Sequence, residues 1–205
     1  DDWEKATNSL KSALENQNIS YVTAHGEGAF YGPKIDLHVK DAIGRRWQLS
    51  TIQVDFAQPD NFDLQFVDNN NKRVKPVMIH RALLGSIERF TGILIENYAG
   101  EFPGWLSPVQ VKILTIGDVS NYLNKITKSL KGFRYEVDDR NLRLGEKLHD
   151  ASKDRIPITL IVGEKDELSN TLAINIRSQE NQQNVKYEDA IKQIKANLKT
   201  PIFKI

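Results

Sequence analysis

The stretch Pro76-Val77-Met78-Ile79-His80-Arg81-Ala82-Leu83-Leu84-Gly85-Ser86-Ile87-Glu88-Arg89-Phe90 contains the features that decide the fold. Residues 77–79 form a short apolar run that is typical of a buried strand, and Pro76 suits the start of an edge strand. From Ala82 onward the apolar residues follow helical spacing, and Gly100 is a suitable stop for that helix. We therefore predict a strand that leads directly into an amphipathic helix.

The predicted helix carries a shallow trough of small and charged residues. Arg89 lies in this trough beside Gly85 and Gly92, next to an apolar face formed by Leu83, Ile87, Phe90 and Leu94. A glycine inside a helix costs about 1 kcal/mol, so we expect a backbone or a flat ligand to approach closely there. A guanidinium in such a trough can stack on an aromatic ring and pair with phosphate. The alternative is a core helix packed through its glycines, with an arginine at its rim.

Antiparallel strands are predicted before this stretch. Residues 34–40 alternate between polar and apolar as in a half-buried strand, residues 41–44 form a hairpin turn, and residues 46–56 form a second strand. Polar residues occupy both faces of the second strand, so we expect it to border a cavity as well as a core. The other expected elements are a helix over residues 3–16, a strand that starts at Tyr21-Val22, and a hairpin with arms at residues 62–67 and 75–79. This pattern indicates an α+β arrangement, an antiparallel sheet with helices against it.

A domain boundary is predicted near Pro103 and Pro108, in a segment that also holds a glycine and a tryptophan. We place the two domains at residues 1–104 and 105–205. Beyond the boundary, apolar strands alternate with amphipathic helices, which predicts an α/β domain with a mixed, largely parallel sheet. The predicted strands are residues 109–116, 134–137, 156–162 and 172–176, and the predicted helices are residues 120–131, 144–154 and 187–198.

The composition of the 205 residues is that of an ordinary globular protein, with 40% hydrophobic and 27% charged residues. The chain has no cysteine, which excludes disulfides and thiolate metal ligands within it. No apolar run approaches the roughly 20 residues of a membrane span and no signal peptide opens the chain, so we expect no membrane partner and a cytoplasmic protein or an organellar copy. Residues 1–107 carry a net charge of −3 and residues 108–205 a net charge of +4. A basic second half is typical of a nucleic-acid contact or of an ordinary solvated surface.

The opening stretch resembles motif 3 of class II aminoacyl-tRNA synthetases, in the form found in threonyl-tRNA synthetase. Residues 26–36 (GEGAFYGPKID) and 47–56 (WQLSTIQVDF) extend the resemblance upstream. Residues 102–110 (FPGWLSPVQ) extend it downstream, and it continues more weakly to the end of the chain. Long motifs in the same order as in the family identify the chain as a member of it. The resemblance implies part of a class II catalytic core followed by an anticodon-binding domain.

The resemblance implies the ligation of threonine to tRNA(Thr) through threonyl-adenylate, with ATP and Mg²⁺. Such chemistry holds two anions in line, so it needs positioned cations and hydrogen-bond donors more than a nucleophile. By resemblance, Arg89 and Lys34 are the catalytic residues, and the ATP-binding residues are Arg89, Gln48 and Thr51. The threonine-binding residues are, on the same basis, Tyr31, Gln53, Ser86 and His80. The residues alone leave open a turn-capping role for Tyr31 and a solvated strand charge at Lys34, and they assign no role to Asp36 or Asp55.

His80 matches one of three ligands of a zinc ion that, in the family, grips the amino and hydroxyl groups of threonine. Neutral imidazole is a good zinc ligand, and an open coordination position is what a substrate would take. One ligand cannot hold zinc, and the two others implied, a cysteine and a histidine, are not matched by His25 or His38. The zinc site is therefore incomplete, and we expect no tightly bound zinc if the chain is complete as given. The alternative is a histidine satisfied within the core.

Two family motifs have no counterpart in the sequence. Motif 1 builds the homodimer interface of the family, and motif 2 carries an arginine that grips the α-phosphate of ATP. The predicted helix of residues 3–16 also has nothing before it to pack against. We therefore predict a fragment that does not form threonyl-adenylate alone, and we make no prediction of its oligomeric state.

The second half resembles the anticodon-binding domain of class II synthetases. By resemblance the anticodon is read by an amide, a guanidinium and a carboxylate, those of Asn141, Arg155 and Asp166. Such groups can hydrogen-bond the edges of splayed-out bases. Asp166 stands where the family has Glu, and two family arginines appear as His149 and Asn175, which weakens the implied affinity. Arg177 could compensate for them.

Two other functions use the same parts. One is a non-catalytic tRNA-binding module or accessory subunit derived from a class II synthetase, which the reading frame before Asp1 would distinguish from the enzyme. The other is a synthetase of neighbouring specificity, such as a prolyl, histidyl or glycyl enzyme. The combination of residues 30–34 (FYGPK) with residues 79–81 (IHR) argues against the latter, because it resembles the threonyl form.

Overall fold

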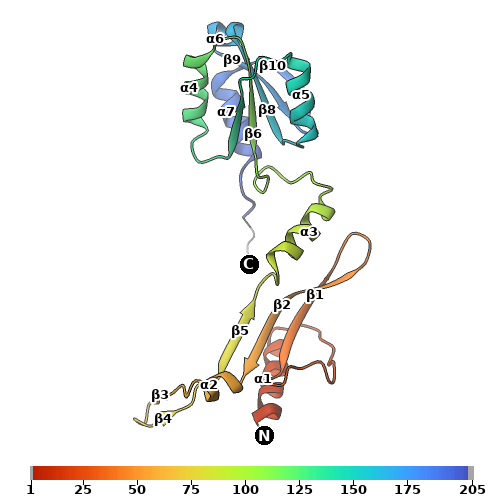
Figure 1. Cartoon of the computed structure of the whole chain (residues 1–205), viewed down its shortest axis with the longest axis vertical. Helices are drawn as coiled ribbons and strands as arrows, with labels where there is room; N and C mark the ends of the chain where they lie inside the picture. The colour runs from red at the N-terminus through yellow and green to blue at the C-terminus, as the bar shows by residue number, and fades with distance from the viewer. Residues whose placement is uncertain (1, 203–205) are drawn as a thin grey trace. The chain divides into compact units, whose positions relative to one another are not determined.

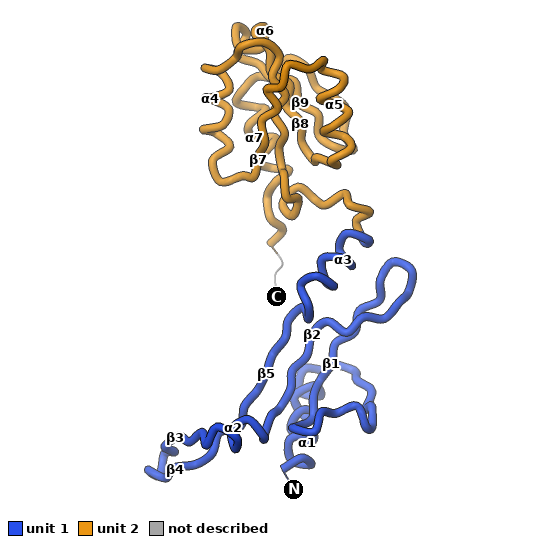
Figure 2. Tube along the Cα trace, in the orientation of Figure 1, with its two compact units in different colours: residues 1–97 blue, residues 98–205 orange. Residues whose placement is uncertain are grey.

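The computed structural model describes residues 2–202, and the chain divides into two compact units, residues 1–97 and 98–205 (Figure 2). The division falls between Asn97 and Tyr98, at the end of a helix. The boundary between functional domains at residues 104 and 105 stays a prediction. None of the helices within the described residues is long and apolar enough to cross a membrane.

Unit 1 is built on a three-stranded antiparallel sheet with the strand order β1-β2-β5 (Figure 1). Between β2 and β5 the chain forms first the short helix α2 and then a two-stranded hairpin, β3-β4. The elements are α1 (Asp2–Asn16), β1 (Lys34–Lys40), β2 (Arg46–Asp55), α2 (Ala57–Asn61), β3 (Phe66–Val67), β4 (Arg73–Val74), β5 (Met78–Ala82) and α3 (Ile87–Asn97). The predicted antiparallel sheet with helices is confirmed.

The hairpin turn between β1 and β2 is organised by the carboxylate of Asp41. This carboxylate accepts hydrogen bonds from the backbone N–H groups of Ile43 (3.1 Å) and Arg45 (2.8 Å), and from Nε1 of Trp47 (2.9 Å). Aspartate favours such turns because its side chain can bond the backbone a few residues ahead. Burial of the Asp41 carboxyl raises its pKa, but the hydrogen bonds from Trp47 and Arg45 outweigh burial and lower the pKa to about 2.

Residues 76–90 form a strand and a helix, but their boundaries and burial differ from the prediction. β5 continues to Ala82, which pairs with Thr51 of β2, and α3 begins only at Ile87. The chain bends between them because Gly85 has a φ of +66°, a left-handed conformation that ends the regular backbone. β5 pairs on one side only, and Ile79 is 65% exposed, so the prediction of a buried strand is wrong. Leu83 is exposed as well.

Other predictions for unit 1 need correction. Tyr21 and Val22 lie in irregular chain rather than in a strand. The predicted hairpin exists, but its paired arms are only the short strands β3 and β4, and the segment that begins at Met78 pairs with β2 instead. Leu37, predicted on the buried face of β1, is exposed. The apolar alternation therefore indicated the strand correctly and its burial incorrectly.

Unit 2 is an α/β domain whose mixed five-stranded sheet has the order β10-β9-β8-β6-β7. β6 pairs in parallel with β7 and β8, whereas β9 and β10 are antiparallel. The predicted α/β mixed-sheet class is confirmed. The elements are β6 (Val111–Ile116), α4 (Ser120–Ser129), β7 (Tyr135–Asp138), α5 (Leu144–Lys153), β8 (Ile158–Gly163), α6 (Glu164–Ser169), β9 (Thr171–Ile176), β10 (Gln182–Lys186) and α7 (Tyr187–Asn197).

The core of unit 2 lies on one face of this sheet. Helices α4 and α7 pack there against β6, β8 and β9, whose inward side chains are fully buried, while α5 covers the other face next to β6 (Figure 1). α6 and β10 were not predicted. α6 has only six residues, and β10 has the polar sequence QQNVK, so neither shows a distinct apolar period.

Candidate functional site

One face of the sheet in unit 1 gathers most of the site residues that the sequence nominates there. Residues directly opposite each other on antiparallel strands point to the same face of a sheet. The register pairs Lys34 with Gln53, Asp36 with Thr51, and Gln53 with His80. The three strands therefore present one polar face, which carries Lys34, Asp36, Thr51, Gln53, Asp55 and His80.

Asp36 is the centre of a hydrogen-bond network on this face. One carboxylate oxygen, Oδ1, accepts from Nε2 of Gln48 and from Oγ1 of Thr51, each at 2.7 Å. The other, Oδ2, pairs with Nζ of Lys34 at 2.5 Å. Burial of the Asp36 carboxyl raises its pKa, but the hydrogen bonds from Lys34, Thr51 and Gln48 outweigh burial and hold the pKa below its usual value. The carboxylate is therefore ionised at neutral pH.

A β-bulge explains how Gln48 reaches this face. Strict alternation along β2 would place Gln48 and Thr51 on opposite faces of the sheet. The pairing of β1 with β2 shifts register between Leu37 and His38, so that Leu37 pairs with Ser50 and His38 pairs with Gln48. A bulge re-aims the side chains next to it. As a result the Gln48 amide and the Thr51 hydroxyl lie 3.1 Å apart and both contact Asp36.

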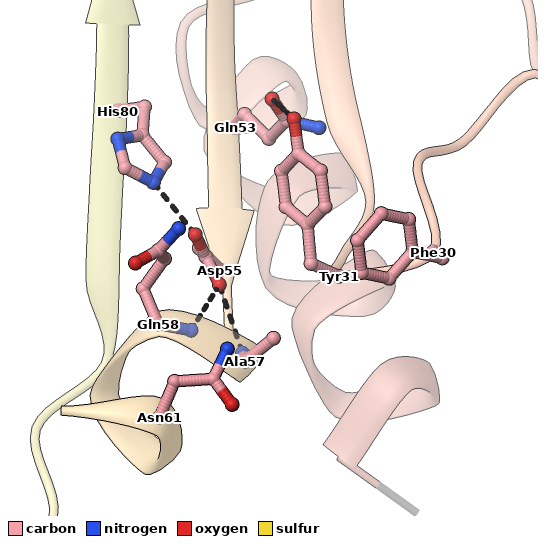
Figure 3. Close-up of a pocket in the computed structure, with 8 residues that line it drawn as sticks. All are labelled: Phe30, Tyr31, Gln53, Asp55, Ala57, Gln58, Asn61 and His80. Carbon is pink, nitrogen blue, oxygen red and sulfur yellow. Dashed lines mark hydrogen bonds and ion pairs between the residues drawn. The ribbon is translucent and has the colours of Figure 1, made fainter. Parts of the chain in front are cut away.

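A second group of residues lines an open cavity of about 420 Å³ at the end of β2 (Figure 3). Tyr31 projects into it from the loop before β1, and its hydroxyl donates a hydrogen bond of 3.3 Å to Oε1 of Gln53. The chain before β1 is fixed there because the N–H of Phe56 donates to the carbonyl of Tyr31. The lining residues are Phe30, Tyr31, Gln53, Asp55, Ala57, Gln58, Asn61 and His80.

Asp55 holds the ring of His80 within this cavity. Nε2 of His80 lies 2.8 Å from Oδ2 of Asp55, whose side chain is only 3% exposed. Burial raises the pKa of the Asp55 carboxyl, but the backbone N–H of Gln58, the His80 ring and the N–H of Ala57 donate to it and hold the pKa below its usual value. An ionised carboxylate can only accept hydrogen bonds, so Nε2 of His80 carries the proton. Nδ1 is then the ring atom left for another partner.

The residues present do not form a metal site by themselves. Within residues 2–202, no group of three or more His, Cys, Asp or Glu side chains is placed to hold a metal ion. His80 is hydrogen-bonded to Asp55, and the Asp55 carboxylate also accepts hydrogen bonds from the backbone at the start of α2. The donor set therefore does not fit zinc without ligands from elsewhere.

Ser86 and Arg89 lie at the start of α3. Oγ of Ser86 accepts the backbone N–H of Arg89 at 3.2 Å, which makes Ser86 the N-cap of the helix. A Cβ built on Gly85 would lie 2.9 Å from Nη2 of Arg89, 2.9 Å from the carbonyl oxygen of Leu49 and 3.7 Å from that of Gln48. The Arg89 guanidinium thus lies close to the backbone of β2. The predicted close approach occurs at Gly85, whereas nothing among the described residues lies within 4 Å of a Cβ on Gly92.

The three residues nominated for the anticodon lie at two ends of the sheet in unit 2. Asn141 follows β7 and Asp166 follows β8, and the carboxyl ends of parallel strands share one edge of a sheet. Arg155 precedes β8 and therefore lies at the opposite end, roughly 20 Å away along a six-residue strand. The Asp166 carboxylate accepts the backbone N–H of Gly163 at 3.0 Å, so it also caps α6.

Arg155 and Arg177 contact the segment at the start of unit 2. Nη1 of Arg155 forms an ion pair of 2.8 Å with Glu101, and the stem of Arg155 lies 3.2 Å from the position of a Cβ on Gly100. The guanidinium of Arg177 donates to three backbone carbonyls, those of Glu101, Phe102 and Arg155. Arg177 therefore holds the segment in place, and three of its five N–H donors are engaged in that role.

Sequence reasoning missed the two carboxylates that organise the polar face, Asp36 and Asp55. Each was visible as an acid next to nominated residues, since Asp36 follows Lys34 by two positions and Asp55 follows Gln53 by two. Residues two apart on a strand share a face. That signal places the acids correctly, but only the register shows which donors they accept.

Comparison with known proteins follows the division into two units. Residues 2–98 match the family model for the tRNA synthetase class II core domain (G, H, P, S and T), and residues 110–197 match the model for the anticodon binding domain. A class II core joined to an anticodon-binding domain is the composition of a class II aminoacyl-tRNA synthetase. The curated relatives narrow the class, and they show that the chain belongs to the threonyl-tRNA synthetase family.

The relatives are threonine–tRNA ligases. The chain is 50% identical over 182 residues to that of Clostridium tetani, an alignment that covers 87% of the chain and 28% of the relative. It is 47% identical over 197 residues to that of Acetivibrio thermocellus, covering 95% and 31%. The chain thus spans about a third of the length of these relatives. The core-domain model covers synthetases for five amino acids (G, H, P, S and T), and these relatives are the enzymes for threonine.

Solved structures agree on the fold. The RNA binding domain of threonyl-tRNA synthetase from Cryptosporidium parvum superposes with a TM-score of 0.83 at 32% identity, over 96% of the chain and 50% of that structure. A prolyl-tRNA synthetase from the same organism superposes with a TM-score of 0.64 at 19% identity, over 86% of the chain and 39% of that structure. The latter likeness concerns the fold alone.

Proposed function

We propose that the chain is part of a threonine–tRNA ligase, which activates threonine with ATP to threonyl-adenylate and transfers it to tRNA(Thr). The observation that supports this most is the polar sheet face, where Lys34, Thr51, Gln53 and His80 from three strands lie together. The composition of this face suits such chemistry, because a cation and amides can hold an anionic ligand while a Tyr–Gln pair and a histidine lie beside it.

The proposed division of labour follows the geometry. Gln48 and Thr51, joined by Asp36, would bind the nucleotide with Arg89, whose guanidinium lies beside the same strand. Lys34 and Arg89 would supply positive charge against the phosphates of ATP, and the substrate would be the complex of ATP with Mg²⁺.

Threonine would lie in the cavity of Figure 3, against Tyr31, Gln53 and His80. The Tyr31 hydroxyl and the Gln53 amide are already bonded to each other, so both are held at the wall of the cavity. Ser86, proposed as a further contact, is outside this lining and serves α3 as its N-cap. Zinc takes no part in the steps proposed for these residues, because they do not complete a metal site.

Unit 2 would bind the anticodon loop of tRNA(Thr) through Asn141, Arg155 and Asp166. The spread of these residues over the length of β8 favours an extended single strand over a single base as the ligand. Arg155 is half-exposed, and its guanidinium bonds to Glu101 through Nη1, so several of its five N–H donors can serve RNA.

A titration of the chain with tRNA tests this function. We expect tRNA(Thr) to bind at least about tenfold more tightly than an unrelated tRNA, measured by filter binding at fixed salt, since affinity for RNA depends strongly on salt. Equal affinity for both tRNAs would contradict an anticodon-reading role. Separately, we expect no ATP–pyrophosphate exchange by this chain alone, and measurable exchange would show that motifs 1 and 2 are not needed.

A further inference from the structure

We propose that Asp36 is a positioning residue for the nucleotide-binding side of the polar face: it holds the nitrogen end of the Gln48 amide and so fixes where the amide oxygen, Oε1, meets a ligand. The inference deepens the proposed function and rests on it. Asp36 itself would not touch the ligand.

The orientation of the Gln48 amide follows from the chemistry of its partners. The atom of Gln48 that lies 2.7 Å from Oδ1 of Asp36 has to be a donor, because an ionised carboxylate only accepts. That atom is Nε2, which also lies within hydrogen-bond distance of Oγ1 of Thr51, at 3.1 Å. The nitrogen end of the amide is therefore held by Asp36 and Thr51, which fixes the position of Oε1.

The Thr51 hydroxyl is fixed by the same network. It donates its single proton to Asp36 at 2.7 Å and accepts from Gln48. Asp36, Gln48 and Thr51 thus close a ring of three hydrogen-bond contacts. Closed rings of this kind hold side chains before a ligand arrives, which lowers the entropy that binding has to remove.

Lys34 completes the arrangement on the other carboxylate oxygen. Its ammonium has three N–H donors and uses one on Oδ2 of Asp36, so two remain for an anion. The network therefore divides the ligand's contacts into two kinds. Lys34 suits a phosphate, whereas Gln48 suits a donor such as an exocyclic amine or a ribose hydroxyl.

The side chains of this network are largely buried, so their positions are fixed by the fold. The side chain of Asp36 is 14% exposed and that of Lys34 is 23% exposed. The donors come from two strands and from both sides of the bulge in β2, at sequence separations of 2, 12 and 15 residues. Donors that are distant in the sequence thus converge on a single carboxylate.

The test uses the whole chain and the variants Asp36→Ala and Asp36→Asn. The matched control is Asp60→Asn, which also removes one negative charge and a lysine partner, Lys75, within unit 1 but away from this network. The first measurement needs no ligand: the side-chain NH₂ signals of Gln48 in ¹H–¹⁵N spectra, assigned with a Gln48→Ala sample. Backbone amide signals of β1 and β2 report whether each variant is folded.

We expect the Gln48 NH₂ signals in Asp36→Ala to move to the positions of an exposed glutamine and to exchange with water at least about tenfold faster. Asp36→Asn, which keeps an acceptor but loses the attraction to Lys34, should show a smaller change in the same direction. Asp60→Asn should show none. Unchanged Gln48 signals in a folded Asp36→Ala chain would overturn the proposal.

The second measurement is the affinity for adenosine from the same spectra. Adenosine has no phosphate, so the charge that the substitution frees on Lys34 does not affect it. We expect affinity to fall at least about tenfold in Asp36→Ala, since two side chains would have to be immobilised on binding. Release of Gln48 with no loss of affinity would overturn the proposal. If the unsubstituted chain does not bind adenosine while Asp36→Ala still releases Gln48, the nucleotide role of this face fails and the tethering by Asp36 is supported.

Discussion

Substitution of Gly32 by alanine tests how the loop that carries Tyr31 is seated on β2. The N–H groups of Val54 and Phe56 donate to the carbonyls of Pro33 and Tyr31, so the loop lies directly against the end of that strand. A Cβ on Gly32 would lie 2.0 Å from the carbonyl oxygen of Val54 and 2.8 Å from its carbonyl carbon. These are backbone atoms of a paired strand, so the loop has to move away.

The size of the effect follows from that contact. Overpacking in a well-packed site costs about 1–3 kcal/mol, and the upper end applies because the neighbour is backbone rather than a flexible side chain. The φ of Gly32, +156°, adds strain for a residue with a Cβ. A cost of about 3 kcal/mol corresponds to about a hundredfold shift toward the open loop.

Amide hydrogen exchange of Val54 and Phe56 measures this opening, because their N–H groups bond the loop. We expect protection of both amides to fall about a hundredfold in Gly32→Ala. The control is Gly92→Ala in α3, where a Cβ meets nothing within 4 Å among the described residues. That substitution should stabilise the helix by up to about 1 kcal/mol. Protection of Val54 and Phe56 that stays within about threefold in Gly32→Ala would refute the reasoning.

Three further changes test other parts of the chain. Glu101→Gln frees Arg155 from a half-exposed ion pair that contributes at most about 1 kcal/mol, so unit 2 should keep its stability. The anticodon hairpin of tRNA(Thr), followed by fluorescence anisotropy, should bind about two- to fivefold more tightly, because a negative charge is removed and a guanidinium is released. Lys147 is 2% exposed and its ammonium donates to two backbone carbonyls, so Lys147→Met should lower the free energy of unfolding of unit 2, measured in urea, by about 2–4 kcal/mol. The pKa of Asp41 lies at about 2 in the folded chain, below its unfolded value of about 3.9. The ionised Asp41 carboxylate therefore stabilises the folded chain above about pH 4, and this stabilisation is lost as the pH falls toward 2. Unfolding followed by Trp47 fluorescence should report the loss.

Each of these predictions has a contrary result. Weaker hairpin binding by Glu101→Gln would mean that Glu101 positions Arg155 for RNA instead of competing with it. For the buried lysine, the matched control is Lys192→Met at an exposed position, and equal effects of the two substitutions would remove the special role of Lys147. Asp41→Asn should lose part of the stability change between pH 4 and pH 2, and an unchanged profile would place that change in other carboxyls.

Local patterns predicted the elements well where they were long. The helix at α1, the hairpin of β1 and β2, and the helices α5 and α7 are confirmed close to their predicted residues. Burial was predicted less well, because alternation shows which side chains share a face but not what covers that face. Ile79 and Leu83 are apolar and regularly spaced, yet both are exposed. The short elements β10 and α6 carry too few apolar residues to signal at all.

Sequence by itself determined the family, the order of the elements, and the residue types available to a site, because these depend on motifs and on periods of a few residues. The tertiary structure alone decided which side chains meet. Gln48 reaches Asp36 only because a bulge shifts the register of β1 against β2, and His80 meets Asp55 only because β5 pairs with β2. Register is set by contacts between strands that lie far apart in the sequence, and one residue of shift moves a side chain to the other face.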